Sequence, residues 1–155
     1  MKILKLLRIN NWVKNIFILM PLFFSGQFFD YDKFFDNVIV LIGFSFIASS
    51  VYIINDLFDL KYDKTHPEKK FRPLASGKIS IGFSIKFAIL LVIIGHLIIY
   101  VKSLNCMIIS FLYFTINLFY SYKLKQIPII DFVIISIGFV LRLFIGGEIT
   151  NGSVI

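Results

Sequence analysis

The sequence predicts an all-α protein, a polytopic transmembrane helical bundle of about five spans. Hydrophobic residues make up 58% of its 155 residues, and only 16% are charged. Ordinary soluble domains are about 45–50% apolar and about 25% charged, and a soluble domain of this length could not bury so much apolar surface. Aromatic residues at 17% and a mean hydropathy of +0.87 exclude a disordered chain, which is poor in both.

The apolar residues fall into five stretches that approach the roughly 20 residues needed to cross a bilayer core. We expect spans at 13–29, 37–54, 83–101, 104–120 and 127–147. The first stretch is short and is interrupted by Pro21. Together the spans form a single membrane domain over residues 1–155, with one long connection at 55–80.

Basic residues gather in alternate connections. The N-terminal stretch, the 55–80 connection and the connection after the fourth span hold most of the 16 Lys and Arg. Because cytoplasmic loops carry the excess of Lys and Arg, the N-terminus and the 55–80 loop are predicted to be cytoplasmic in an integral protein of the cell membrane. The formal charge of +7 is therefore read as a topology signal and not as a sign of nucleic-acid binding.

Three aspartates open the 55–80 loop: Asp56, Asp59 and Asp63. On a helix they fall within about 60° of one another, so three carboxylates are expected on one face at the membrane edge. Like charges so close need neutralisation, and Mg²⁺ is commonly shared between carboxylates and substrate phosphates. The sequence therefore predicts a Mg²⁺ site at these aspartates.

Cationic residues follow the aspartates directly, among them Arg72. Arg forks and Lys ammonium groups are the usual phosphate ligands, so the loop supplies metal ligands and phosphate donors together. A solvated loop of mixed charge is the alternative interpretation. The spacing of the acids at the end of a span favours a site, because solubility alone does not require it.

The motif Asn55-Asp56-x-x-Asp59-x-x-x-Asp63, followed by Arg72-Pro73-Leu74-Ala75-Ser76-Gly77, resembles the first aspartate-rich motif of the UbiA-type prenyltransferase superfamily. Four further segments are similar to one branch, the decaprenyl-phosphate phosphoribosyltransferases. They are Asn11-Trp12-x-Lys14-Asn15, His66-Pro67-x-Lys69-x-x-Arg72-Pro73, Tyr120-Ser121-x-x-Leu124-Lys125 ahead of Asp131, and Gly138-Phe139-Val140-Leu141-Arg142.

The resemblance implies a helical membrane enzyme of about nine spans that moves phosphoribose from phosphoribosyl diphosphate to a polyprenyl phosphate. It implies Mg²⁺ on Asp56, Asp59 and Asp63, and substrate contacts from Lys14, Asn55, Arg72 and Lys125. For Lys14, beside Trp12, an interfacial anchor is the alternative role. The partners implied are a polyprenyl lipid and a diphosphate donor.

The superfamily carries a second aspartate-rich motif in its other half, and Glu148 is the sole acid after Asp131 here. The chain therefore resembles an N-terminal half, and we expect it to be a truncated product or to need a missing C-terminal half. Alone it is expected to be inactive. Two other interpretations stay open: a prenyltransferase that uses an allylic diphosphate, and a non-enzymatic transporter component or a remnant.

Five polar or small features inside the expected spans need an account. Arg142 is predicted to be a structural polar contact that snorkels outward or pairs with Glu148, since an intramembrane Arg is costly. His96 is expected to make an inter-helix hydrogen bond, and Cys106 to be a small apolar residue. Gly146-Gly147 is expected to end a helix or to pack it closely. Asp131 suits either the first turn of a helix or a functional role.

Overall fold

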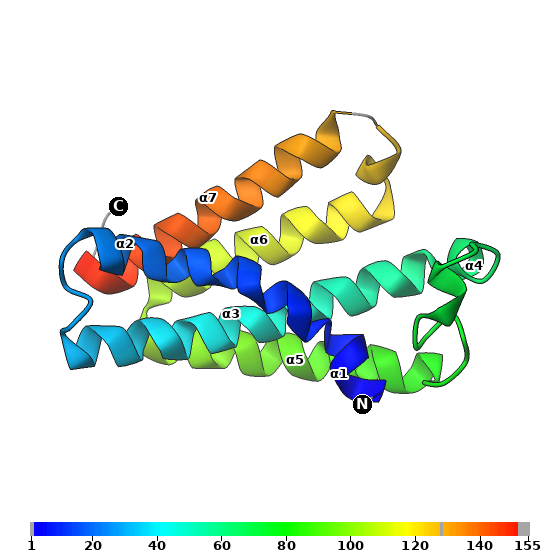
Figure 1. The fold of residues 1–155 in the computed structure, drawn as a ribbon, viewed down its shortest axis with the longest axis horizontal. Coiled ribbons are helices and arrows are strands. Elements are labelled where there is room, and N and C mark those ends of the chain that lie inside the picture. Colours follow the sequence, from blue (N-terminus) through cyan, green and yellow to red (C-terminus); the bar gives the residue numbers. More distant parts are fainter. Residues whose placement is uncertain (1, 128, 152–155) are drawn as a thin grey trace.

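The computed structural model describes residues 2–127 and 129–151, with the side chain of Gln126 left out, and every regular element in this part is helical (Figure 1). The all-α class is therefore confirmed. In order, the α-helices are α1 (Lys2–Leu7), α2 (Met20–Phe24), α3 (Tyr31–Phe58), α4 (Leu60–Asp63), α5 (Ile81–Lys102), α6 (Leu104–Tyr122) and α7 (Ile130–Asn151). The 3₁₀ helices are η1 (Ile9–Leu19), η2 (Lys69–Phe71) and η3 (Leu124–Gln126).

Among the described residues, four helices are long and apolar enough to cross a membrane: α3, α5, α6 and α7. The first expected span, 13–29, is built differently, as η1 followed by the short helix α2. Pro21 stands at the start of α2, and a proline inside a helix removes a hydrogen bond and clashes with the preceding turn. The asparagines of η1 also compete with the backbone for hydrogen bonds, so a continuous α-helix is disfavoured here.

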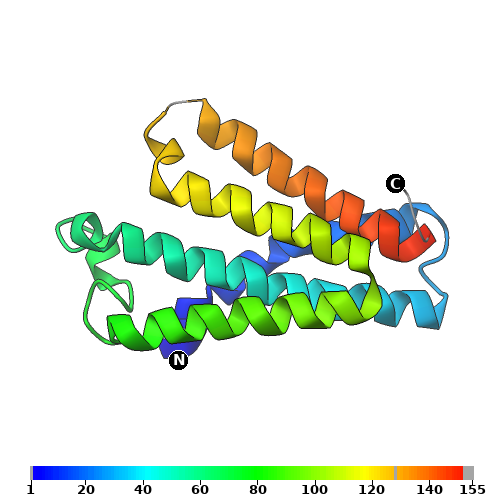
Figure 2. The same cartoon turned by 180° about the vertical axis from the view of Figure 1, so that it is seen from behind.

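The long helices pack as two pairs, α3 with α5 and α6 with α7, and the α1–η1–α2 segment lies across them (Figures 1 and 2). Helix α1, the connection holding α4 and η2, and the α6–α7 connection all lie at one end of the bundle (Figure 1). These are the basic segments of the sequence. The fold thus gathers them around the aspartates, while the membrane side that this end faces stays a prediction.

Glycines allow helices α3 and α5 to approach each other closely. A Cβ built on Gly95 of α5 would lie 2.6 Å from the carbonyl oxygen of Gly43 in α3. Membrane helices use such small residues to bring backbones into direct contact, because no hydrophobic effect drives association within lipid.

Gly146 of α7 supports a testable prediction about how η1 is held. A Cβ at this position would lie 1.9 Å from the carbonyl oxygen of Ile18, so close packing at Gly146 is confirmed. We expect Gly146→Ala to push η1 away from α7 and to lower the stability of the protein by about 1–3 kcal/mol. The emission of Trp12, the single tryptophan, measures the displacement in detergent, with Gly82→Ala as the matched control because its Cβ would meet nothing within 4 Å. Equal emission from both variants would contradict the prediction.

Arg142 is buried inside the bundle, at 5% exposure, so the expectation that it snorkels outward is wrong. Its Nε donates to Asn15 Oδ1 at 2.9 Å, and its Nη1 donates to the carbonyl oxygen of Gly138 at 2.6 Å. Glu148 accepts a hydrogen bond from Asn105 Nδ2 at 2.8 Å. The guanidinium is retained because aromatic rings and interior oxygens replace its hydration, and Arg142 is a structural polar contact as expected.

The expectation for His96 is corrected, and that for Cys106 is confirmed. His96 Nδ1 is 2.9 Å from the carbonyl oxygen of Val92 in its own helix, so this hydrogen bond lies within α5 and not between helices. Its ring meets α6 through edge contacts with Phe111 and Phe114. His96 thus contacts α6 through aromatic rings and not through the expected inter-helix hydrogen bond. Cys106 is fully buried and behaves as a small apolar residue.

Candidate active site

The three aspartates lie where α3 ends and α4 begins. Asp56 is in the last turn of α3, Asp59 lies at the junction, and Asp63 is the last residue of α4. The backbone N–H of Asp63 donates to the carbonyl oxygen of Asp59 at 2.8 Å, so the chain keeps a helical path through the junction. Asp56 and Asp63 are almost fully buried, at 3% and 1% exposure.

Arg72 joins two of these carboxylates. Its Nη1 lies 3.0 Å from Asp56 Oδ1 and 2.7 Å from Asp63 Oδ2. Since one nitrogen contacts both acids, Asp56 and Asp63 face a common point. Arg8, from the turn between α1 and η1, also pairs with Asp56 Oδ1, and its guanidinium carbon lies 5.3 Å above the ring of Tyr52. Two buried carboxylates are thus neutralised by two guanidinium groups.

Asp59 points to different partners. It pairs with Lys125 of η3 and accepts a hydrogen bond from Asn55 Nδ2 at 3.2 Å. Within residues 2–127 and 129–151, no three His, Cys, Asp or Glu side chains gather closely enough to hold one metal ion. The expected face of three acids is therefore replaced by a pair, Asp56 with Asp63, and a separate Asp59, because the junction of α3 and α4 turns Asp59 toward Lys125.

The structure brings together three of the four residues expected to contact substrate. Asn55, Arg72 and Lys125 each contact one of the aspartates. Lys14 is exposed in η1 and makes no ion pair or hydrogen bond among the described residues. The sequence analysis did not predict that Arg8 contacts Asp56. The sequence offered one sign of it, because Arg8 belongs to the basic N-terminal stretch that is predicted to lie on the same side of the membrane as the aspartates.

The donors at this site fit a divalent cation shared by Asp56 and Asp63. Asp63 Oδ1 and Asn55 Oδ1 are shielded from solvent and have no hydrogen-bond partner. A buried oxygen without a hydrogen-bond partner costs free energy, and a bound ion is one way to satisfy it. Mg²⁺ takes oxygen ligands and is often held by one or two carboxylates together with phosphates. Arg72 Nη1, within 3.0 Å of Asp56 Oδ1 and 2.7 Å of Asp63 Oδ2, shows that these two carboxylates can share one positive charge.

Asp131 adds a further carboxylate near this end of the bundle. It stands in the first turn of α7, and its Oδ1 is shielded from solvent with no hydrogen-bond partner. It interacts electrostatically with Tyr120 of α6, as does Asp59. Placement in the first turn satisfies the helix dipole, and a functional role for Asp131 stays a prediction.

Fold and site together define a class: an integral membrane protein, a helical bundle with paired aspartates, arginines and a lysine at one end. Such a site suits a phosphate ligand bound through a metal. The chain belongs to the UbiA prenyltransferase family, whose model matches residues 17–155.

Relatives with a stated activity match most of the chain. It is 32% identical over 148 residues to a decaprenyl-phosphate phosphoribosyltransferase of Corynebacterium glutamicum, covering 93% of this chain and 45% of that protein. It is 32% identical over 110 residues to a digeranylgeranylglyceryl phosphate synthase of Sulfurisphaera tokodaii, covering 71% of this chain and 39% of that protein. The chain thus spans about half of these relatives or less.

A solved structure confirms the architecture. It was reported in a study of digeranylgeranylglyceryl phosphate synthase in membranes, and it matches with a TM-score of 0.80 at 26% identity. The match covers 94% of this chain and 51% of that structure. The helical bundle described above is therefore about half of a UbiA-type fold.

Proposed function

We propose that this chain forms the donor-binding half of a Mg²⁺-dependent membrane transferase that moves phosphoribose from phosphoribosyl diphosphate to a polyprenyl phosphate. Membership of the UbiA family supports a prenyl substrate and a diphosphate donor. The similarity to decaprenyl-phosphate phosphoribosyltransferases supports the sugar donor. The observation that carries the proposal is that Asp56 and Asp63 both contact the guanidinium of Arg72. The guanidinium of Arg8 and the ammonium of Lys125 lie beside them.

Each residue has a defined task in this proposal. Asp56 and Asp63 would hold Mg²⁺, which would supply charge stabilisation for a departing diphosphate. The planar fork of Arg72, beside these carboxylates, binds phosphate oxygens. Lys125 contributes a further positive charge, and Asn55 orients Asp59 through its amide. The polyprenyl tail stays among the helices, out of water.

The chemistry follows from these positions. The bond between the sugar C1 and the diphosphate oxygen breaks as an oxygen of the lipid phosphate forms a bond to C1. The electron pair of the broken bond leaves with the diphosphate, and the cationic side chains of the site stabilise the resulting negative charge. Because the chain spans about half of its relatives, we expect turnover to need residues beyond these 155. Turnover by the purified chain would show that this half is sufficient.

Binding of inorganic pyrophosphate to the purified chain in detergent tests the donor site. We expect Asp63→Asn to weaken Mg²⁺-dependent binding at least about tenfold, since removal of one carboxylate loses a charged metal ligand. Asp32→Asn is the matched control, because Asp32 is exposed in the first turn of α3. Binding that does not depend on Mg²⁺, or equal loss in both variants, would contradict the donor site.

Transfer of a prenyl group from an allylic diphosphate is the second candidate function. It is favoured by the likeness to digeranylgeranylglyceryl phosphate synthases in sequence and fold. Both reactions release diphosphate, so the aspartates serve either. Competition of phosphoribosyl diphosphate and geranylgeranyl diphosphate for the pyrophosphate site separates them, and stronger competition by the sugar donor supports phosphoribosyl transfer.

A further inference from the structure

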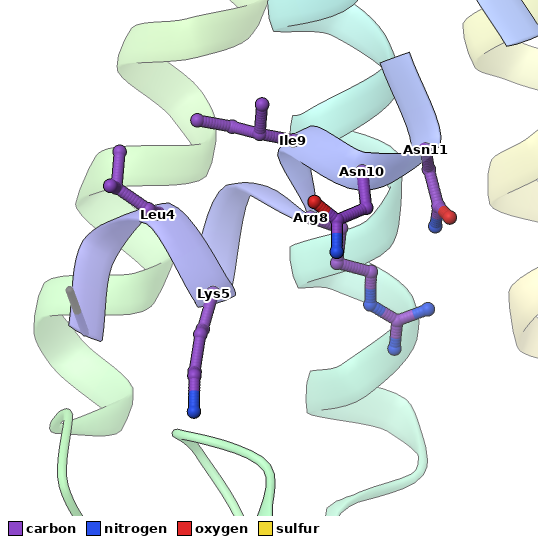
Figure 3. Close-up of a pocket in the computed structure, with 6 residues that line it drawn as sticks. All are labelled: Leu4, Lys5, Arg8, Ile9, Asn10 and Asn11. Atoms are coloured by element: carbon purple, nitrogen blue, oxygen red, sulfur yellow. The ribbon is translucent and has the colours of Figure 1, made fainter. Parts of the chain in front are cut away.

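A hollow at the N-terminal turn borders the candidate active site. It has a volume of about 530 Å³ and is lined by Leu4, Lys5, Arg8, Ile9, Asn10 and Asn11. Figure 3 shows the side chains of Lys5 and Arg8 both pointing downward in the view, with Leu4 and Ile9 projecting away from them. The hollow therefore has a cationic and amide side next to an apolar side.

The polar groups of this hollow are hydrogen-bond donors that the protein leaves uncommitted. Among the described residues, Lys5 Nζ and the side-chain amides of Asn10 and Asn11 make no hydrogen bond or ion pair. Arg8 donates to Asp56 Oδ1 through Nη2. Its Nε and Nη1 have no hydrogen-bond partner among the described residues. No carboxylate lines the hollow. Such a set of donors, free of acceptors with negative charge, matches a phosphate group.

The backbone at Arg8 is held in an unusual conformation. Arg8 has φ 51° and ψ 48°, a left-handed conformation that costs a residue with a Cβ roughly 1–2 kcal/mol. This turn separates α1 from η1 and so forms the hollow. Local strain persists where the surrounding structure imposes it, and it is concentrated at ligand sites.

Hydrogen bonds fix the same segment to α3. Ser49 Oγ donates to the carbonyl oxygen of Leu7 at 2.9 Å, and Trp12 Nε1 donates to Ser49 Oγ at 2.9 Å. These bonds lie on either side of the left-handed turn. The backbone that carries the donors of the hollow is therefore held in place before a ligand arrives, which lowers the ordering cost of binding.

We propose that this hollow binds the phosphate of a lipid phosphate monoester, the acceptor of the transfer reaction. Arg8 is the link, because one guanidinium contacts Asp56 of the donor site and lines the hollow. The acceptor oxygen is thus brought beside the diphosphate donor, and Leu4 and Ile9 contact the first part of the apolar chain. This inference rests on the proposed function for its chemistry, while the hollow and its donors stand independently of it.

Binding of farnesyl phosphate to the purified chain in detergent tests the site, with farnesol and inorganic phosphate as partial probes. We expect Lys5→Gln to weaken farnesyl phosphate binding about tenfold, the effect of one charge-assisted hydrogen bond. Lys2→Gln is the matched control, since Lys2 is also an exposed cation of α1 but lines a different hollow. Neither variant should change pyrophosphate binding.

The outcomes separate this site from general attraction to membranes and from the donor site. Equal loss in the Lys2 and Lys5 variants, or equal loss of binding to phosphatidylglycerol vesicles and to farnesyl phosphate, would overturn the proposal, because a lipid surface attracts any cation. Farnesol binding as strong as that of farnesyl phosphate would also overturn it. Binding of farnesyl phosphate that depends on Lys5, in a chain that fails to bind pyrophosphate, would support this site and contradict the proposed donor site.

Discussion

Replacement of Arg72 by Gln is expected to make the stability of the protein depend on Mg²⁺. Arg72 contacts both Asp56 and Asp63 through one nitrogen. Loss of a partner from a buried ion pair costs about 3–5 kcal/mol, because a charge is left buried without compensation. Among the residues that the structure describes, Arg72 is the cation paired with Asp63, and Asp63 would lose it. We therefore expect a large loss of stability in EDTA.

Mg²⁺ should restore much of this loss if the two carboxylates form a metal site. A ligand at 100 times its dissociation constant stabilises the folded state by about 2.7 kcal/mol. The readout is thermal unfolding in detergent, followed by labelling of Cys106 with a fluorescent maleimide. Cys106 is the single cysteine and is fully buried, so it reacts when the bundle opens. Wild-type protein should respond less, since Mg²⁺ must displace Arg72.

Two controls make this result specific. Arg72→Lys keeps a positive charge and should lose less stability in EDTA than Arg72→Gln. The double variant Asp63→Asn with Arg72→Gln removes the unpaired charge, so it should be more stable in EDTA than Arg72→Gln and should not respond to Mg²⁺. An Arg72→Gln protein as stable as wild type in EDTA, or one insensitive to Mg²⁺, would show that Asp56 and Asp63 do not share a cation.

The fold class was predictable because it depends on composition and on the lengths of apolar stretches. Lipid allows helices to span because every backbone group is bonded within the helix. For residues 13–29 the sequence predicted a short stretch interrupted by Pro21, and the structure builds it from η1 and the short helix α2. A mean hydropathy over a stretch of sequence hides single residues of this kind, whereas each of them changes the local hydrogen bonding of the backbone.

The gathering of Asn55, Arg72 and Lys125 around the aspartates was predictable, but the pairing of these residues was not. Helical spacing placed Asp56, Asp59 and Asp63 on one face, whereas in the structure Asp59 pairs with Lys125, 66 positions further along the chain, and Asp56 and Asp63 pair with Arg72. Long-range pairing of this kind depends on how α6 and α7 pack on α3. No local pattern specifies it. For the same reason Arg8, 48 positions before Asp56, was missed.

Arg142 illustrates a buried charge whose partners also come from distant segments. Its guanidinium carbon lies 4.9 Å from the ring centre of Phe44 in α3, 5.1 Å from that of Tyr113 in α6 and 5.6 Å from that of Phe139 in α7. Its Nε bonds to Asn15 of η1. The side chain of Arg142 thus contacts three elements besides its own helix: α3, α6 and η1. The helix η1 is too short to be stable through its own hydrogen bonds.

Replacement of Arg142 by Ala is expected to lower the stability by at least about 3 kcal/mol. Cation–π contacts away from water contribute up to about 2 kcal/mol, and hydrogen bonds from charged donors about 1.5–3 kcal/mol. Arg142→Lys should recover little, because an ammonium group cannot reproduce the planar fork that stacks on rings and bonds to Asn15 at once. Leu143→Ala, at a neighbouring position that is 40% exposed, is the matched control and should cost less than about 1 kcal/mol.

Labelling of Cys106 and the emission of Trp12 distinguish how the Arg142→Ala protein fails. If Arg142 joins η1 to the bundle, Trp12 emission should shift to the red at a lower denaturant concentration than that at which Cys106 becomes reactive. A single transition that moves both signals together would mean that the guanidinium stabilises the whole bundle and not the docking of η1. Stability equal to that of Leu143→Ala would contradict both, since it would mean that the rings and Asn15 give the buried charge no net stabilisation.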